Sequence, residues 1–221
     1  MATTLHDPRV KTVLDRMYAE AQQQRQILHD RRDEFQRLSK ASIQERADAF
    51  SDLYIPVTPE AGRLLYLVVR GTRPTTVIEF GMSFGISALH LASAVRDNGS
   101  GRVVTTELNA AKIASAKRTF AEAGLDDLIT VLEGDALSTL KDVTSPVDFV
   151  LLDGWKELYL PVIKLIEPQL TPGALIVADN TEMAEAKPYL HYLRDPDNGY
   201  VSVNFHARDA DSMEISCRAI T

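Results

Sequence analysis

The chain has 221 residues, of which 45% are hydrophobic, enough for one α/β domain with a single buried core. Its formal net charge of −7 argues against broad binding to the phosphate backbone of a nucleic acid. It contains no apolar run near the ~18 residues of a membrane span, and its N-terminus lacks the basic and apolar parts of a signal peptide. We therefore expect a cytoplasmic protein, and with Cys217 as the single cysteine it has no intrachain disulfide.

The N-terminal quarter is expected to be helical. Apolar residues recur at helical spacing over residues 8–40. This pattern is typical of a surface helix that caps a core, and a lid or a dimer contact is the alternative. A second helix is expected over residues 58–70, with Thr58 as its N-cap. We divide the single expected domain into a helical cap over 1–57 and an α/β core over 58–221.

From residue 75 onward the pattern changes to alternating strands and helices. Short β-rich runs are separated by helical segments long enough for crossovers, which predicts a Rossmann-like, doubly wound, mostly parallel sheet. The last two runs alternate more and are joined by a polar turn, so we expect an antiparallel C-terminal pair at one edge of a seven-stranded sheet. The expected strands cover residues 75–80, 103–107, 128–133, 147–153, 174–179, 200–206 and 212–219, and the expected helices cover 86–96, 110–123 and 155–169.

The residues that end the parallel strands are the candidates for function, because ligands of open α/β sheets bind at the carboxyl ends of the strands. The first strand ends in Glu79-Phe80, and the glycines at Gly81 and Gly85 allow a tight turn and the close approach of a ligand. This pattern is neither a dinucleotide fingerprint nor a phosphate loop. It also fits a plain turn from strand to helix.

Acids after the second and third strands suit a nucleoside. Glu107 ends the second strand, where a carboxylate can accept both hydroxyls of a ribose. Asp135 and Ala136 follow the third strand and place an acid and a small residue where an adenine edge can lie. Because no phosphate-binding feature accompanies them, the pattern favours a nucleoside without phosphates, such as adenosine joined to methionine, over NAD or ATP.

The fourth and fifth strands end in acids that suit a metal ion. Asp153 and the pair Asp179-Asn180 each follow a strongly apolar stretch, where an unpaired charge is costly. Two carboxylates and one amide oxygen at the same sheet edge form an oxygen-only set suited to Mg²⁺. The alternative is that these acids cap the helices that follow them.

These segments together resemble one family. Asp153-Gly154-Trp155-Lys156 closely resembles the segment of catechol O-methyltransferases that supplies a metal aspartate, an aromatic wall and a catalytic lysine. Ala178-Asp179-Asn180 is similar to the second metal segment of that family, and Asp211-Ser212-Met213-Glu214 to the stretch with the acid that orients the second hydroxyl. The segment from Glu79 to Ser87 resembles the methionine-binding loop, and Glu107 matches the ribose acid. The matches run in the same order from about residue 55 to the end.

The resemblance implies an O-methyltransferase that uses S-adenosylmethionine and Mg²⁺, or another divalent cation, to methylate a catechol or phenolic small molecule. A homodimer is the habit of this group and an expectation here. Lys156 would take the proton, and Glu214 would orient the second hydroxyl. The resemblance and the strand-end pattern give cofactor contacts to Glu79, Gly81, Ser83, Gly85, Ser87, Glu107, Asp135, Ala136, Asp153 and Trp155, metal contacts to Asp153, Asp179 and Asn180, and substrate contacts to Trp155, Lys156, Asn180 and Glu214.

Departures and alternatives stay open at this point. Gly154 replaces a histidine of the animal enzymes, so one packing contact to adenine must come from elsewhere. Trp155 also fits a plain core residue, and Lys156 a solvated helix residue. Glu214 also fits an outward-facing acid on an edge strand.

Two other functions remain possible. A transfer-RNA wobble-uridine O-methyltransferase of the same metal-dependent group would need a positive track for RNA. The obvious basic candidates are Arg31, Arg32, Arg37 and Lys40, and neighbouring acids offset them. The second is a non-catalytic cofactor-binding or dimerisation module built on the N-terminal helix.

Overall fold

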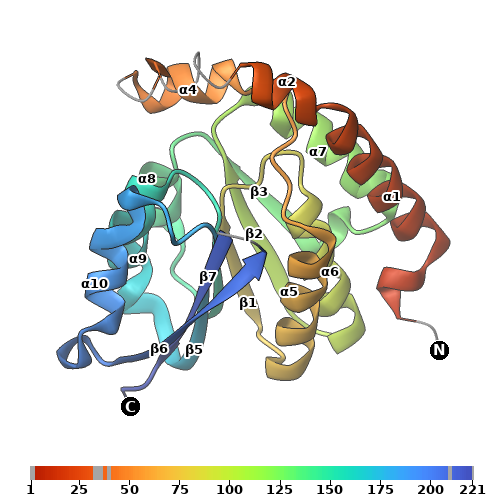
Figure 1. The fold of residues 1–221 in the computed structure, drawn as a ribbon. Helices are drawn as coiled ribbons and strands as arrows, with labels where there is room; N and C mark the ends of the chain where they lie inside the picture. Colours follow the sequence, from red (N-terminus) through yellow and green to blue (C-terminus); the bar gives the residue numbers. More distant parts are fainter. Residues whose placement is uncertain (1–2, 32–36, 39–40, 209–210, 221) are drawn as a thin grey trace.

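The computed structural model describes residues 3–31, 37–38, 41–208 and 211–220. The chain forms a seven-stranded sheet with helices on both faces (Figure 1). The strand order is β3-β2-β1-β4-β5-β7-β6, and β7 is antiparallel to both of its neighbours while the other pairings are parallel. This confirms the predicted doubly wound, mostly parallel sheet with an antiparallel C-terminal strand.

The helices and strands alternate along most of the chain. The strands are β1 (Thr76–Phe80), β2 (Arg102–Glu107), β3 (Ile129–Glu133), β4 (Val147–Leu152), β5 (Leu170–Ala178), β6 (Tyr200–Arg208) and β7 (Asp211–Arg218). The α-helices are α1 (Pro8–Gln23), α2 (Arg25–Asp30), α4 (Ile43–Ala49), α5 (Pro59–Thr72), α6 (Ile86–Asn98), α7 (Ala110–Ala123), α8 (Ala136–Thr139), α9 (Tyr159–Ile166) and α10 (Lys187–Arg194). Short 3-10 turns include η5 (Lys156–Leu158) and η7 (Ala184–Ala186).

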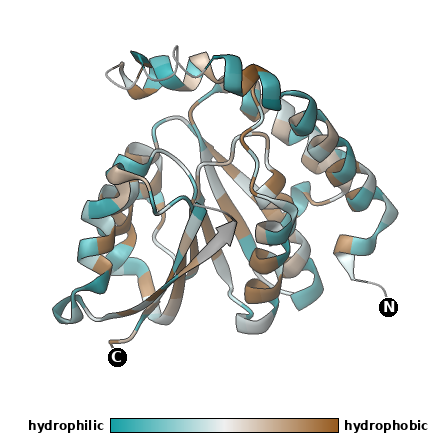
Figure 2. Ribbon diagram, in the orientation of Figure 1, coloured by the Kyte–Doolittle hydropathy of each residue, from teal (hydrophilic) through white to brown (hydrophobic). Residues whose placement is uncertain are grey.

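Two apolar layers hold the sheet, one on each face. Successive strand residues point to opposite faces, so Val77 of β1 joins the layer with α1, α5, α6 and α7, and Ile78 joins the layer with α9 and α10. Strand β4 is buried on both faces, as an apolar run in a parallel sheet requires. Figure 2 shows the apolar residues gathered along the sheet and on the helix faces that cover it.

The N-terminal region differs from the single helix predicted over residues 8–40. Helix α1 ends at Gln23, α2 begins at Arg25, and part of the predicted range lies outside the described residues. Helix α1 packs along α6 and α7 (Figure 1), which is the capping role expected of an amphipathic helix. It buries Val10, Val13, Leu14, Met17 and Ala21.

Some helices lie outside the individual helical ranges predicted from the sequence, although α4 falls within the expected helical cap over 1–57. Helix α4 is one: its Ser42 and Glu45 form a capping box, in which each side chain bonds to the backbone of the other. Helices α8 and α10 are also additions, and the helix predicted over 155–169 is split into η5, α9 and a final 3-10 turn. No helix in the described ranges is both long and apolar enough to cross a membrane.

The strand order places the functional edge. It reverses between β1 and β4, and in open α/β sheets ligands bind at such a switch point. The loops that follow these two strands approach each other closely. A Cβ atom on Gly81, which has φ +98°, would lie 2.6 Å from the Cα atom of Gly154. Glycine at position 81 allows the loops after β1 and β4 to come this close. The carboxyl ends of both strands therefore lie at the same place on the sheet edge.

If α1 is part of the core, shortening its buried side chains must destabilise the whole protein. Met17 is 1% exposed, and M17A should lower the free energy of unfolding by about 2–5 kcal/mol because it leaves a cavity. The exposed Gln22 on the same helix is the control, and Q22A should change stability by no more than about 0.5 kcal/mol. Urea unfolding followed by circular dichroism measures both. Equal stability of M17A and Q22A would show that α1 does not pack as described.

Candidate functional site

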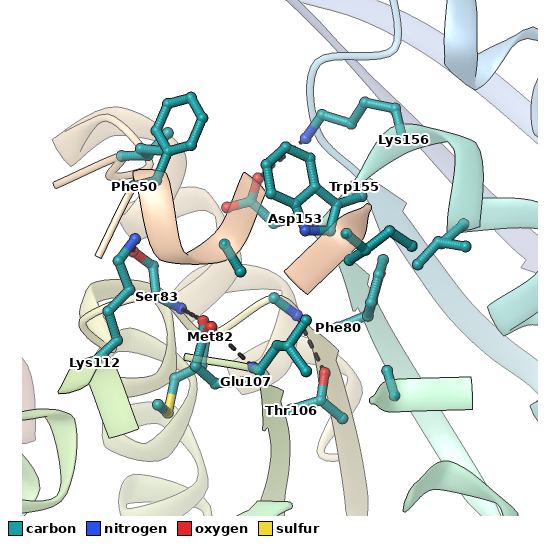
Figure 3. A pocket seen from close by; sticks show the side chains of 18 of the residues that line it. Phe50, Phe80, Met82, Ser83, Thr106, Glu107, Lys112, Asp153, Trp155 and Lys156 are labelled. Carbon is teal, nitrogen blue, oxygen red and sulfur yellow. Dashed lines mark hydrogen bonds and ion pairs between the residues drawn. The ribbon is translucent and has the colours of Figure 1, made fainter. Parts of the chain in front are cut away.

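A cavity of about 410 Å³ lies at the carboxyl ends of β1 and β4 (Figure 3). The loops after the first four strands form its floor, and α4 with residues 50–57 covers it. The predicted cofactor residues that line it are Gly81, Ser83, Ser87, Glu107, Asp135, Ala136, Asp153 and Trp155. Glu79 and Gly85 are not part of the lining. Gly85 instead allows close packing, because a Cβ atom there would lie 2.4 Å from the Phe120 ring.

A steric contact explains why residue 154 is a glycine. A Cβ atom at this position would lie 2.6 Å from the ring of Phe80, the last residue of β1. The histidine that the family resemblance leads one to expect therefore does not fit here without a shift of Phe80. The cavity wall at this point is made by Trp155 and by residues from the N-terminal segment instead.

Glu107 is held as a fixed acceptor at the end of β2. Its Oε2 accepts a hydrogen bond from the Ser83 N–H at 2.8 Å, and its Oε1 accepts from the N–H groups of Leu108 and Asn109, both at 2.9 Å. Each carboxylate oxygen can accept two hydrogen bonds, so Oε2 keeps one position for a ligand hydroxyl. This arrangement leaves room for one ribose hydroxyl, not for both of the hydroxyls expected from the sequence.

Lys112 is a cavity residue that the sequence analysis missed. It is buried in the first turn of α7, its Nζ donates to the Ser83 Oγ at 3.1 Å, and desolvation lowers its pKa. Its position five residues after Glu107, one turn into the following helix, is the signal that points to it. Lys112 adds a positive charge to the side of the cavity where Glu107 lies.

Glu79 is fully buried behind the β1 loop. Thr105 donates to its Oε2 at 2.5 Å, and its Oε1 has no partner. Desolvation raises the pKa of this carboxyl to about 7. Because Glu79 is fully buried and does not line the cavity, its predicted contact with the cofactor stays a prediction.

Asp153 and Asp179 meet at the ends of β4 and β5, where the Asp179 N–H donates to the Leu152 carbonyl at 3.0 Å. With Asn180 and Asp211 they line a second cavity of about 80 Å³. Burial raises the pKa of Asp153 to about 6 and that of Asp179 to about 7, and the negative charges of the neighbouring carboxylates add to both shifts.

The structure does not support the alternative that Asp153 and Asp179 cap the helices that follow them. Trp155 and Met183 occupy the N-cap positions of η5 and η7. The donor set of two carboxylates and one amide suits a hard cation. Among the described residues, no three or more His, Cys, Asp or Glu side chains form a group that could hold a metal ion, so the predicted set depends on Asn180.

Lys156 is not a solvated helix residue. Its side chain is 10% exposed, its Nζ lies 3.5 Å from the Asp153 Oδ1, and it donates to the Tyr159 Oη at 2.8 Å. Tyr159 in turn donates to the backbone carbonyl of Asp179 at 3.0 Å. Sequence reasoning missed Tyr159, although its spacing of three residues places it on the same side of the helical turn as Lys156.

Trp155 is half-buried at the cavity wall (Figure 3), which does not fit a plain core residue. The Arg46 guanidinium of α4 lies 4.4 Å from the centre of its ring, and the Phe50 ring meets it edge-on at 6.0 Å. Arg46 also pairs with Glu157. These contacts hold α4 against the segment that follows β4. Nothing in the hydrophobic pattern of the sequence predicted α4 or these contacts.

The structure does not bring Glu214 to the cavity, contrary to the expected substrate contact. It is fully buried in β7, where both of its oxygens accept hydrogen bonds from Arg194 of α10, at 2.8 and 2.6 Å. Alternation along β7 is the reason: Glu214 faces the α10 layer, whereas Asp211 and Met213 fall on the opposite face. The acid of this strand that reaches the site is Asp211.

The basic cluster considered for RNA is only partly described. Arg32 and Lys40 lie outside the described residues. Arg31 donates to the Ala49 carbonyl at 3.1 Å and lies 3.6 Å from Asp52. This arginine therefore serves to join α2 to the segment after α4.

The buried Glu79 predicts a specific dependence of stability on pH. The folded protein, with a pKa near 7, holds a proton that the unfolded chain, with a pKa near 4.5, releases between these values. The stability of the wild type relative to E79Q should therefore be greatest below pH 4.5 and fall, by up to about 1.4 kcal/mol per unit, as the pH rises toward 7. Thermal melts of the cofactor-free proteins from pH 4 to 8 measure this difference. A difference that is flat with pH would contradict the assignment.

Known proteins with similar sequences are methyltransferases. A model of the family described as "Methyltransferase domain" matches residues 78–181. Catechol O-methyltransferase of Sus scrofa is 36% identical over 141 residues, which cover 60% of this chain and 74% of that protein. An O-methyltransferase of Mycobacterium tuberculosis is 35% identical over 153 residues, and this match spans 64% of each of the two chains.

Solved structures share the fold at lower identity. The O-methyltransferase of Bacillus cereus in complex with SAH has a TM-score of 0.70 at 20% identity, over 83% of this chain and 96% of that one. The O-methyltransferase TomG of Streptomyces achromogenes, in complex with SAM, has a TM-score of 0.69 at 23% identity, over 80% and 87%. Taken with the sequence matches and the cavity at the switch point, this places the chain in the catechol O-methyltransferase-like family of class I S-adenosylmethionine-dependent O-methyltransferases.

Proposed function

We propose that this protein transfers the methyl group of S-adenosylmethionine to one hydroxyl of a catechol-like small molecule, with the help of a divalent cation. The observation that carries the proposal is the pair of buried carboxylates, Asp153 and Asp179, beside the buried amine of Lys156. Two buried negative charges are costly unless a cation balances them. Lys156 balances one of them, and a divalent cation held by Asp153, Asp179 and Asn180 would balance the rest.

The chain's own residues divide the chemistry among them. When bound, the cation would lower the pKa of a substrate phenol from its ordinary value of about 10. Lys156 is the residue placed to take the phenol proton, in the neutral form that it can adopt once a cation, rather than its own ammonium group, balances Asp153; its Nζ lies between Asp153 and Tyr159. Tyr159 holds this amine in place, because its hydroxyl is itself anchored to the Asp179 carbonyl. The methyl group then passes from sulfonium to oxygen in a direct displacement. Alignment of the two reactants would lower the activation barrier by roughly 7–11 kcal/mol.

The rim of the site suits a flat apolar ring. Ile55 and Met183 line the cavity and are 51% and 43% exposed, so both present apolar surface at its rim. They come from the N-terminal segment and from the loop after β5, and the metal-site acids lie next to both segments. An aromatic substrate that places two oxygens near Asp153 and Asp179 would cover these side chains.

The proposal predicts that turnover depends on the cation. Methyl transfer from S-adenosylmethionine to a panel of catechols, measured by SAH formation, should vanish with EDTA and return with Mg²⁺. Among the described residues, Lys156 is the one cation paired with these acids, so the second carboxylate depends on the added cation and we expect a full loss. Turnover that is indifferent to EDTA would contradict the cation site, and methylation of RNA but not catechols would favour the wobble-uridine alternative.

If Lys156 is the base, its substitution should slow the chemical step and leave cofactor binding unchanged. K156M should lower kcat by about 10²–10⁴-fold, the range for a positioned acid or base, with SAH affinity changed by less than about twofold. K164M is the matched control, because Lys164 is a half-exposed lysine in the neighbouring helix α9. Rates and SAH binding by calorimetry give both numbers. Unchanged kcat in K156M would remove Lys156 from the mechanism.

A further inference from the structure

We propose that Asp211 is a positioning residue for the cation site: it fixes the side-chain amide of Asn180 so that the carbonyl oxygen, not the nitrogen, faces Asp153 and Asp179. This inference rests on the proposed function, because it concerns how a divalent cation would be held. The sequence pattern gave Asp211 no role, and the family resemblance pointed to Glu214 instead. The inference assigns Asp211 a role that depends on one hydrogen bond.

The orientation of the Asn180 amide follows from the chemistry of its partner. The Asn180 Nδ2 donates to the Asp211 Oδ1 at 2.8 Å. An ionised carboxylate only accepts hydrogen bonds, so the amide nitrogen must be the atom that faces it. The Oδ1 of Asn180 then lies on the other side of the amide. Without Asp211 the two orientations of the amide would be close in energy, and one of them presents N–H groups, which cannot bind a cation.

The backbone around this pair is fixed from both sides. Asn180 has φ +52°, a left-handed conformation that asparagine tolerates better than most residues. Beyond it, the Thr181 N–H donates to the Ser212 carbonyl at 3.0 Å, and the Ser212 N–H donates to the Glu182 carboxylate at 2.9 Å. These bonds join the end of β5 to the start of β7, so Asp211 and Asn180 keep their relative positions.

Asp211 acts through Asn180 rather than as a cation ligand. It lines the 80 Å³ cavity together with Asp153, Asp179 and Asn180. Yet the described acids do not converge as a group of three around one point that could hold a metal ion. Partners of this kind, which orient a ligand, typically cost 10–100-fold in metal affinity when they are removed.

The test compares the Mn²⁺ affinity of two variants substituted at the same position. Electron paramagnetic resonance of the free ion measures binding, with SAH present and no substrate. D211A removes the acceptor and should weaken binding by about 10–100-fold. D211N keeps an acceptor oxygen of the same reach but adds a competing NH2 donor, so its loss should be clearly smaller than that of D211A. D197N removes an exposed acid on the turn before β6, at the opposite end of the β6/β7 pair from Asp211, and is the charge control.

A swapped pair guards against a simple folding defect. N180D sets two carboxylates against each other and should weaken Mn²⁺ binding, and N180D/D211N restores one donor and one acceptor and should regain it. Equal losses in D211A and D211N, or no rescue by the double variant, would overturn the inference and show that charge alone matters. Wild-type protein that binds no Mn²⁺ would overturn the proposed function with it, whereas a wild type and D211A that bind equally would overturn the positioning role alone.

Discussion

The burial of two carboxylates at the ends of neighbouring strands is the constraint on which the rest of the site depends. β4 and β5 must be apolar on both faces to lie inside the sheet, and each is followed directly by an acid, Asp153 and Asp179. Their pKa values are raised because the surroundings that stabilise the sheet do not solvate charge. Lys156, Tyr159, Asn180 and Asp211 are all arranged around these two groups.

The larger cavity, which we propose for the cofactor, depends on a different constraint, the close approach of two backbone segments. Gly81 and Gly154 bring the loops after β1 and β4 together, and Phe80 leaves no room for a side chain at Gly154. The wall that a larger residue would have made is supplied by Trp155, whose ring is covered by Arg46 and Phe50. Ile55, Pro56, Asp153 and Asn180 line both the larger and the smaller cavity, so the N-terminal segment, the larger cavity and the acid pair form one continuous site.

Much of this could be read from the sequence because it depends on local patterns. The apolar strand runs and the residues that follow them, as far as Asn180, identified the sheet and the part of the cavity lining that lies at the strand ends. What the sequence could not supply were contacts set by distant packing. Glu214 was assigned from a segment match, but alternation turns it toward Arg194. Asp211 and Arg46 have unremarkable local patterns, and only the fold brings them to the site, whereas Lys112 could have been found from its place in the first turn of the helix after Glu107. The expected homodimer stays a prediction.

The most direct test of the cation site is a crystal structure of the protein with SAH and Mn²⁺, with data collected at an energy where manganese scatters anomalously. Our account predicts one strong anomalous peak bonded to oxygens of Asp153, Asp179 and the Asn180 side chain, with Lys156 beside it. An ordered structure with SAH in the cavity but no anomalous peak at the ends of β4 and β5 would contradict it, and the two acids would then need another explanation.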